Sequence, residues 1–263
     1  MVAISPLATF GREIPARTLP KGPRWPLAEM RTLAVELSNL LADSVTRIGA
    51  GGSIRRQCPD AGDIELIARP TIGTLVNLLG EPCGTSNLLD LRVLDLLQRG
   101  VLELRLDSRD QRHWGEASKR LIFKDRPVDL FSVVAPAQWG VIHVLRTGPG
   151  AFNKRLVTHR RHHGWCPDTI TWRDGQLWPW DFARPLDTPE EVDVFEALHL
   201  PYLAPEHRTD TVRPVHLAPK DRPNRPHDPS ATVWYDPATK EQYHDEAPAN
   251  RTQSSPQPDR TSN

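Results

Sequence analysis

The sequence lacks several features that define particular classes of protein. Its 263 residues include three cysteines, Cys58, Cys83 and Cys166, and their odd number and wide spacing match neither a disulfide framework nor a paired metal motif. No run of about 18 apolar residues is present, so we expect no membrane span and no membrane partner. The first residues also lack the basic and then apolar order of a signal peptide. These absences favour a protein of the reducing cytoplasm.

An excess of charge of either sign is also missing. The 33 basic residues balance 33 acidic residues, which gives a formal net charge of +0. A protein that binds nucleic acid over its whole surface usually carries excess basic charge, so only a local basic region could serve here. Hydrophobic residues make up 38% of the chain, and prolines number 26. This combination predicts that part of the chain is extended or disordered.

The middle of the chain alternates between helical and strand-like hydrophobic periods. Leucine spacing predicts a helix of about 17 residues from Leu27, and another that Ser86 caps and Gly100 ends. Further helices are predicted at 139–145, at 151–163 and after a capping box at 188–191. Strand-like runs lie at 45–48, 64–68, 101–106, 119–123 and 128–134. The pattern predicts an α/β (α+β) fold, with a mixed sheet and helices followed by a smaller α+β part.

The two ends of the chain show no such period. Residues 1–25 predict an irregular lead-in, and residues 209–263, rich in proline and polar side chains, predict a disordered tail. Within the tail, Val233–Pro237 and Tyr243 place aromatic residues around a turn signal. They suit a small hairpin or a docking peptide for a protein partner, although we favour an unstructured segment.

The clearest indication of chemistry lies between Gly51 and Glu65. Gly51-Gly-Ser-Ile-Arg-Arg56 follows a predicted strand, and Gly62-Asp-Ile-Glu65 comes next. Glycines after a strand let backbone N–H groups approach a phosphate closely. Ser53 adds a hydroxyl donor, and Arg56 adds a permanently charged fork of donors. The segment therefore predicts a site for a polyphosphate.

Three acidic residues add a predicted metal site. Asp63 and Glu65 are two residues apart on a predicted strand, so both carboxylates point to the same face. Such a pair attracts hard divalent cations, usually Mg²⁺ together with phosphate oxygens. Asp129 lies in an apolar strand, where an unpaired carboxylate is costly, and would complete a site for two metal ions. Taken singly, each feature also fits an ordinary turn or a solvated strand face.

In order along the chain, these residues resemble the family X DNA polymerases, the relatives of DNA polymerase beta. The resemblance rests first on Gly52-Ser-Ile-Arg-Arg56 followed by Gly62-Asp-Ile-Glu65. Other matching segments, in the family's order, are Trp25-Pro-Leu-Ala-Glu-Met30, Thr147-Gly148, Phe152-Asn-Lys154 and Pro201-Tyr-Leu-Ala-Pro-Glu-His-Arg208. The resemblance covers residues 25–208 and implies a nucleotidyltransferase palm at 26–148 and a thumb at 149–208.

The resemblance also implies a role for each matching residue. Two Mg²⁺ ions, which Mn²⁺ could replace, would bind Asp63, Glu65 and Asp129. A nucleoside triphosphate would contact Gly52, Ser53, Arg56, Gly62, Gly148 and Asn153. The other partner would be a DNA primer–template or gapped DNA. The implied activity is nucleotide addition to a primer 3′-hydroxyl, as in a small repair or gap-filling polymerase.

The sequence also departs from the family pattern. Glu65 replaces an aspartate, Leu145-Arg146 replaces an aromatic pair beside the sugar, and Val157 replaces an arginine that contacts the template strand. Pro149 stands where the family has a serine. Only residues 1–25 precede the palm, so we expect neither a lyase nor a fingers module. Two alternatives remain open: a template-independent terminal, RNA or small-molecule nucleotidyltransferase, and a non-catalytic DNA-binding relative.

A basic cluster occupies the predicted helix at 151–163. Lys154, Arg155, Arg160 and Arg161 would bind DNA phosphates without reading the base sequence. The alternatives are a solvated basic helix and a zinc site of His159, His162, His163 and Cys166, which lacks a second regularly spaced ligand pair. The nearby tryptophans, Trp165, Trp172, Trp178 and Trp180, predict an aromatic core rather than a surface that stacks bases.

Overall fold

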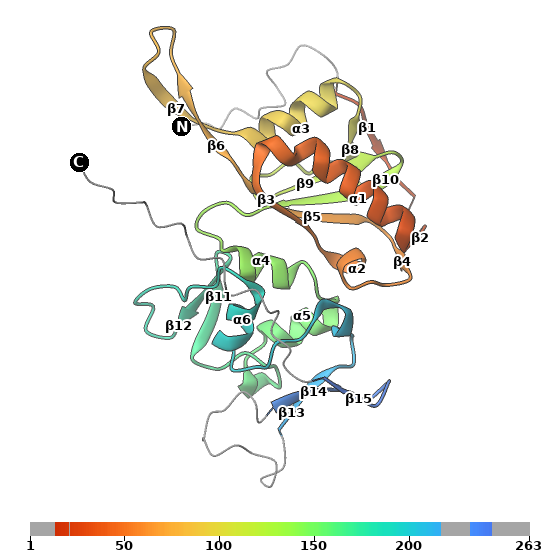
Figure 1. Cartoon of the computed structure of the whole chain (residues 1–263), viewed down its shortest axis with the longest axis vertical. Helices are drawn as coiled ribbons and strands as arrows, with labels where there is room; N and C mark the ends of the chain where they lie inside the picture. The colour runs from red at the N-terminus through yellow and green to blue at the C-terminus, as the bar shows by residue number, and fades with distance from the viewer. Residues whose placement is uncertain (1–13, 21, 217–231, 244–263) are drawn as a thin grey trace, which may run out of the picture.

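The computed structural model describes residues 14–20, 22–216 and 232–243. Its largest element is a mixed six-stranded sheet with strand order β1-β8-β9-β10-β5-β3 (Figure 1). The strands are β1 (Ala16–Thr18), β3 (Val45–Ala50), β5 (Ile64–Pro70), β8 (Leu102–Leu106), β9 (Ser118–Phe123) and β10 (Arg126–Ser132). Strand β1 runs parallel to β8, and β10 runs parallel to β5, whereas the other pairs are antiparallel. The mixed sheet and its helices confirm the predicted α+β class.

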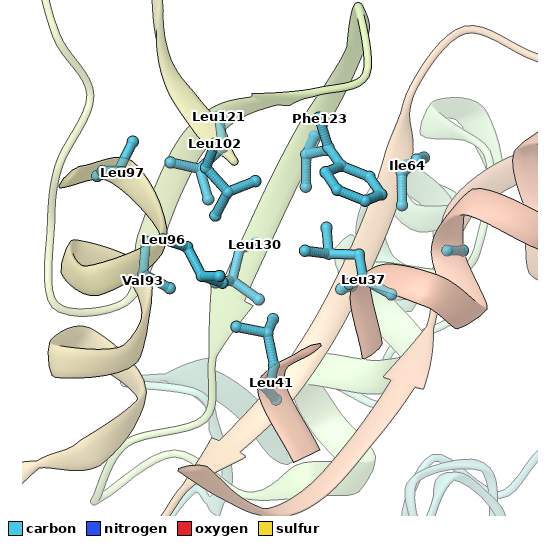
Figure 2. Close-up of a cluster of buried hydrophobic side chains, with 14 of the residues drawn as sticks. Leu37, Leu41, Ile64, Val93, Leu96, Leu97, Leu102, Leu121, Phe123 and Leu130 are labelled. Atoms are coloured by element: carbon cyan, nitrogen blue, oxygen red, sulfur yellow. The ribbon is translucent and has the colours of Figure 1, made fainter. Parts of the chain in front are cut away.

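Helices α1 (Leu27–Leu41) and α3 (Leu88–Gln98) cover one face of this sheet (Figure 1). Their buried side chains form one core with alternate residues of the strands. Figure 2 shows part of this core, with Leu37, Leu41, Ile64, Val93, Leu96, Leu97, Leu102, Leu121, Phe123 and Leu130 pointing toward one another. Because strand side chains alternate between faces, the residues between these positions point to the other face of the sheet.

The predicted boundaries of these two helices are nearly correct. Helix α1 begins at Leu27 as predicted, and α3 ends just before Gly100. The cap of α3 is Asn87 rather than Ser86, because the Asn87 side chain accepts a hydrogen bond from the Asp90 N–H at 3.2 Å. Of the helices described, none combines the length and the apolar composition that crossing a bilayer demands.

Short elements surround the sheet. Strands β2 (Trp25–Pro26) and β4 (Asp60–Ala61) pair with each other, and α2 (Gly52–Arg55) follows β3. A hairpin of β6 (Ile72–Val76) and β7 (Pro82–Asn87) projects away from the body of the molecule (Figure 1). The sequence analysis did not predict this hairpin, whose tip exposes Leu78 and Leu79.

A second core lies beyond the sheet. Its elements are α4 (Trp139–Leu145), α5 (Gly150–Val157), η3 (Arg160–His162), β11 (Ile170–Arg173), β12 (Gln176–Pro179), α6 (Glu191–Ala197) and η4 (Pro205–His207). Val141 and Val144 of α4 belong to this core, although the resemblance had placed residues 139–145 in the palm at 26–148. Trp165 is buried in it as predicted, but Trp180 is exposed.

Both ends of the chain are more ordered than predicted wherever the structure describes them. Ile14 is buried in the first core, and β1 adds a strand to the sheet, so the irregular lead-in is wrong for these residues. Strands β13 (Arg213–His216), β14 (Thr232–Asp236) and β15 (Glu241–Tyr243) form a small sheet where we predicted disorder. The hairpin of the less favoured alternative is therefore present. The predictions for 1–13, 217–231 and 244–263 lie outside the described residues.

Two predicted helical features are wrong in detail. The helix at 151–163 stops at Val157, because the backbone of Thr158 is extended and its carbonyl accepts a hydrogen bond from the Cys166 N–H. The capping box of α6 is made by Glu190 and Asp193. Thr188, the predicted cap, instead donates to the Gln138 side chain.

Candidate active site

The turn from β3 into α2 uses the N–H groups of its two glycines within the protein, although we predicted that such groups approach a phosphate. The N–H of Gly51 donates to the Glu65 carbonyl at 2.8 Å, and the N–H of Gly52 donates to the Arg146 carbonyl at 2.7 Å. Gly52 has a φ of +54°, and a Cβ at this position would lie 1.5 Å from a carboxylate oxygen of Glu65. Only glycine therefore lets the Glu65 carboxylate lie directly against the turn.

The turn borders a cavity of about 400 Å³. The cavity is lined by Gly22, Pro23, Arg24, Ser53, Arg56, Gly62, Asp63 and Glu65. The last five had been predicted from the sequence to bind phosphate or metal. The cavity thus combines a hydroxyl donor, two guanidinium groups and two carboxylates, the chemistry that a polyphosphate with bound cations needs.

Glu65 and Asp129 share one face of the sheet, and Asp63 lies in the bend just before β5, not on the strand where we predicted it. In the parallel pair of β5 and β10, Glu65 lies opposite Asp129, and both point away from α1 and α3 because their neighbours fill the first core. Burial, followed by repulsion from Asp63 and Asp129, raises the pKa of Glu65 to about 7. Burial and Asp129 likewise raise the pKa of Asp63. The carboxylates are therefore near enough to oppose one another's ionisation.

Asp129 differs from the other two acids because cations already face it. Its carboxylate is ion-paired with Arg105, and Nε of Arg120 lies 3.9 Å away. In the described residues, no three Asp, Glu, His or Cys side chains are grouped closely enough to hold a metal ion. Asp63 and Glu65 fit a hard divalent cation, since it would relieve their mutual repulsion. Asp129 would join them as a ligand only when Arg105 withdraws.

The structure adds Arg105 and Arg24, which were not predicted from the sequence as site residues, and shows what Arg146 contacts. Arg105 lies in the strand predicted at 101–106, where no site residue was assigned. Glu103 and Arg105 are the polar positions in the apolar–polar alternation of β8, so their side chains mark the charged face of this strand. Arg146 stacks on Phe131, with 4.0 Å from its guanidinium carbon to the ring centroid. Arg24 lay in a segment we predicted to be irregular.

Residues 145–153 connect α4 to α5 and accept hydrogen bonds from Gly52 and Arg56 through the carbonyls of residues 146 and 147. Nη1 of Arg56 donates to the Thr147 carbonyl at 2.5 Å. Nδ2 of Asn153 donates to the carbonyls of Leu145 at 2.7 Å and Gly148 at 3.1 Å. Gly148 and Asn153, which the resemblance had placed at the nucleotide, are in contact with each other, and the Asn153 amide group stabilises the connection between α4 and α5. Neither residue lines the cavity.

A buried ion triad joins α2 to the second core. Glu191 is ion-paired with Arg55 of α2, and its Oε1 lies 2.8 Å from Nη1 of Arg208. Burial disfavours the charge on Glu191, but Arg208 and Arg55 outweigh burial and lower its pKa to about 2. From the sequence, Glu191 was predicted only to belong to a capping box.

The predicted basic cluster is divided between α5 and η3. Arg155 donates to the carbonyls of Asp210 at 2.6 Å and Val212 at 3.1 Å. Arg160 donates to the carbonyls of Leu198 at 2.9 Å and Trp165 at 3.2 Å, so both arginines hold backbone segments together. Lys154 and Arg161 remain exposed.

The alternative zinc site is not formed by the residues proposed for it. His159 contacts the Ile170 carbonyl at 3.0 Å. The buried Cys166 thiol donates to carbonyls of its own loop. Burial raises the pKa of this thiol, which disfavours the thiolate that zinc requires.

Comparison with known proteins identifies no family. The chain matches no protein-family model, and a search of curated proteins finds no significant match. The function of this chain must therefore be inferred from the site itself.

One consequence of the crowded carboxylates can be measured without any substrate. In metal-free protein, Glu65→Gln should raise the free energy of unfolding at about pH 8, by up to about 3 kcal/mol, because the folded state raises the Glu65 pKa from 4.5 to about 7. The folded state binds the proton more tightly, so the wild type loses stability as the pH rises through this range. The gain should disappear at about pH 4.

The measurement is urea denaturation of both proteins at each pH. Added Mg²⁺ should raise the midpoint of the wild type more than that of the variant, because only the wild type has the repulsion to relieve. A variant less stable than the wild type at the higher pH would contradict the prediction.

Proposed function

We propose that this chain is a metal-dependent nucleotidyltransferase of the family X DNA polymerase type. It would add nucleotides from nucleoside triphosphates to the 3′-hydroxyl of a DNA primer. The observation that supports this most is the cavity that places Ser53 and Arg56 beside Asp63 and Glu65. In this proposal, the six-stranded sheet with its helices is the palm, and the second core is the thumb.

Each group of the site would have a defined task. Ser53 and Arg56 would bind the phosphates of the nucleotide, and Gly52 would shape the turn that holds them. Asp63, Glu65 and Asp129 would hold two Mg²⁺ ions, which supply positive charge for the attacking and leaving oxygens. The primer 3′-hydroxyl would give its proton to water, its oxygen would bond to the α-phosphorus while the bond from that phosphorus to the bridging oxygen of the β-phosphate breaks, and pyrophosphate would leave. The residues would accelerate this step mainly by holding the primer and the nucleotide in line.

Primer extension is the direct test. The full chain would be given a templated primer, a gapped duplex and a bare single strand, in DNA and RNA forms, with Mg²⁺ or Mn²⁺. Extension of the templated primer by matched nucleotides would support the polymerase. Absence of incorporation on every substrate, together with no nucleotide binding, would overturn the proposal.

A template-independent nucleotidyltransferase is the second candidate. It is favoured by Val157, an apolar side chain that is 38% exposed on α5 where the resembling family contacts the template. It is also favoured by the use of Arg155 and Arg160 to bind backbone carbonyls. In the same assay, this candidate requires extension of the bare single strand at least as fast as that of the templated primer.

The exposed basic residues give a prediction for DNA binding. Lys154→Ala with Arg161→Ala should weaken duplex binding and reduce the log–log salt slope by about 0.9 for each phosphate that the variant no longer neutralises. The measurement is a fluorescence-anisotropy titration across salt concentrations. Arg173→Ala, an exposed arginine of β11 that pairs with its neighbour Asp174, is the matched control. An unchanged slope would place the DNA elsewhere.

A further inference from the structure

The projecting hairpin of β6 and β7 exposes both an apolar surface and a strand edge (Figure 1). Among the described residues, these two strands pair only with each other, and an isolated two-stranded hairpin is only marginally stable in water. Leu78 and Leu79 at its tip are exposed, as are Ile72 and Leu75 of β6. We propose that β6 pairs in antiparallel orientation with β6 of a second copy of this chain, so that the protein is a dimer. This inference does not depend on the proposed function.

Charge protects the other sheet edges, β1 and β3, which lie at the two ends of the six-stranded sheet. Arg17 of β1 is ion-paired with Glu103 at 2.7 Å. Arg47 of β3 is ion-paired with Glu190 at 2.6 Å. Charged side chains and prolines on an edge strand discourage another strand from pairing with it. Residues 71–80 contain no charged residue and no proline, so β6 has neither kind of protection.

The register of the hairpin shows which backbone groups of β6 point outward. The N–H of Leu88 donates to the carbonyl of Thr71, the residue opposite it, at 3.0 Å. In an antiparallel pair, the residues that bond to the neighbouring strand alternate along the chain. The N–H and C=O groups of Gly73 therefore face β7, whereas those of Ile72 and Thr74 point away from it. This pairing is regular until a register shift near the tip, so the outward groups can receive a further strand.

The charges of the chain suit a second copy as the occupant of this edge. In a two-fold pairing, the side chains of β6 meet those of the same strand, so a charged edge would repel itself. β6 has no charge, and the whole chain balances 33 basic with 33 acidic residues, so net charge does not keep two copies apart. Duplex DNA is disfavoured as the occupant, because residues 71–80 offer no basic side chain to its phosphates.

The proposed pairing also covers the apolar tip. Because the two strands run in opposite directions, the tip of each hairpin lies beside the base of the other. Leu78 and Leu79 of each copy would then leave water, which favours association. The hairpin follows Pro70, the last residue of β5, whereas Glu65 lies near the start of that strand. At about 3.3 Å per residue, the ends of β5 lie about 20 Å apart, so the dimer would leave the cavity open.

The experiment is sedimentation velocity of the full chain between about 1 and 300 µM, a range suited to the weak association of a small interface. The weight-average mass should rise from 29.6 kDa toward twice this value. Thr74→Pro removes an outward N–H of β6 and should weaken the association at least about tenfold. Thr85→Pro is the matched control, because Thr85 lies opposite Thr74 and its N–H points outward from β7. This variant should still dimerise.

Opposite charges at position 74 test whether the occupant is a second copy. Thr74 is the middle residue of β6 (Ile72–Val76), so a two-fold pairing along this strand brings its two copies close together. Thr74→Lys and Thr74→Glu should each be monomeric at about 100 µM, because like charges would oppose each other across the pair. An equimolar mixture of the two variants should form a heterodimer.

Several outcomes would overturn the inference. A wild type that stays monomeric over the whole range would do so, even if the hairpin then bound another protein. A dimer that Thr74→Pro does not weaken would place the contact elsewhere. Circular dichroism and melting curves at low concentration check that each variant folds. If Thr74→Pro fails to fold, the two charge variants decide, and a mixture that remains monomeric would rule out pairing along β6.

Discussion

Replacing Asp63 with asparagine should reduce nucleotide incorporation at least about a thousandfold, because removal of a metal ligand takes away several kcal/mol of transition-state stabilisation. Asp129→Asn should have an effect of similar size. Asp63→Asn should not reduce stability, since burial and Asp129 raise the pKa of Asp63 and thus disfavour its charged form in the folded state. The measurement is kcat/KM for a single nucleotide on the best substrate found by primer extension.

Two controls accompany this measurement. Asp43→Asn changes an exposed aspartate of η2 (Ala42–Ser44) and should leave the rate unchanged. Urea denaturation should show that each variant remains folded. If Asp63→Asn kept more than about a tenth of the wild-type rate, a loss of less than about 1.4 kcal/mol, the assignment of this acid to the metal site would be wrong.

Glu191→Gln should lower the free energy of unfolding by about 3–5 kcal/mol, because it leaves the buried Arg208 without a counter-charge. The side chain of Arg208 has 0% exposure and that of Glu191 5%, so water cannot replace the missing partner. The folded state lowers the Glu191 pKa from 4.5 to about 2. Its stabilisation is therefore present above about pH 4.5 and is lost as the pH falls through the folded pKa.

Chemical denaturation at neutral pH and melting curves down to about pH 2 would test both parts of this prediction. The difference between variant and wild type should shrink toward the acidic limit. Glu36→Gln removes one partner of an exposed ion pair with Lys124 and should cost less than about 1 kcal/mol. An equal, small effect of both substitutions would mean that the triad does not stabilise the fold.

The sequence predicted those elements correctly that a local hydrophobic period or a short motif specifies. The pattern of apolar residues predicted β5 and β10 and hence the shared face of Glu65 and Asp129. The turn from β3 into α2 was predictable as a turn because its glycines are visible in the sequence, and glycine is required where the Glu65 carboxylate lies against Gly52. Both signals lie within a few residues of chain, and tertiary contacts reinforce them.

The remaining features depend on partners that are distant in sequence. Strand β1 exists because β8 offers a free edge, and nothing within residues 16–18 indicates this. Arg105 and Arg24 form ion pairs only when folding brings them to Asp129 and Asp60. The helix after Gly150 is cut short by hydrogen bonds to the 164–166 segment, although its own residues would allow another turn.

The triad of Arg55, Glu191 and Arg208 also bears on how the chain could be divided. The turn that would hold the nucleotide grows from the sheet, yet its Arg55 finds its counter-charge, Glu191, in the second core. The Gly52 N–H and the Arg56 side chain likewise depend on carbonyls at 146 and 147. A fragment that contains only the sheet and its helices would lack Glu191, the ion-pair partner of Arg55. Residues of both cores therefore shape the site, and neither core could form it alone.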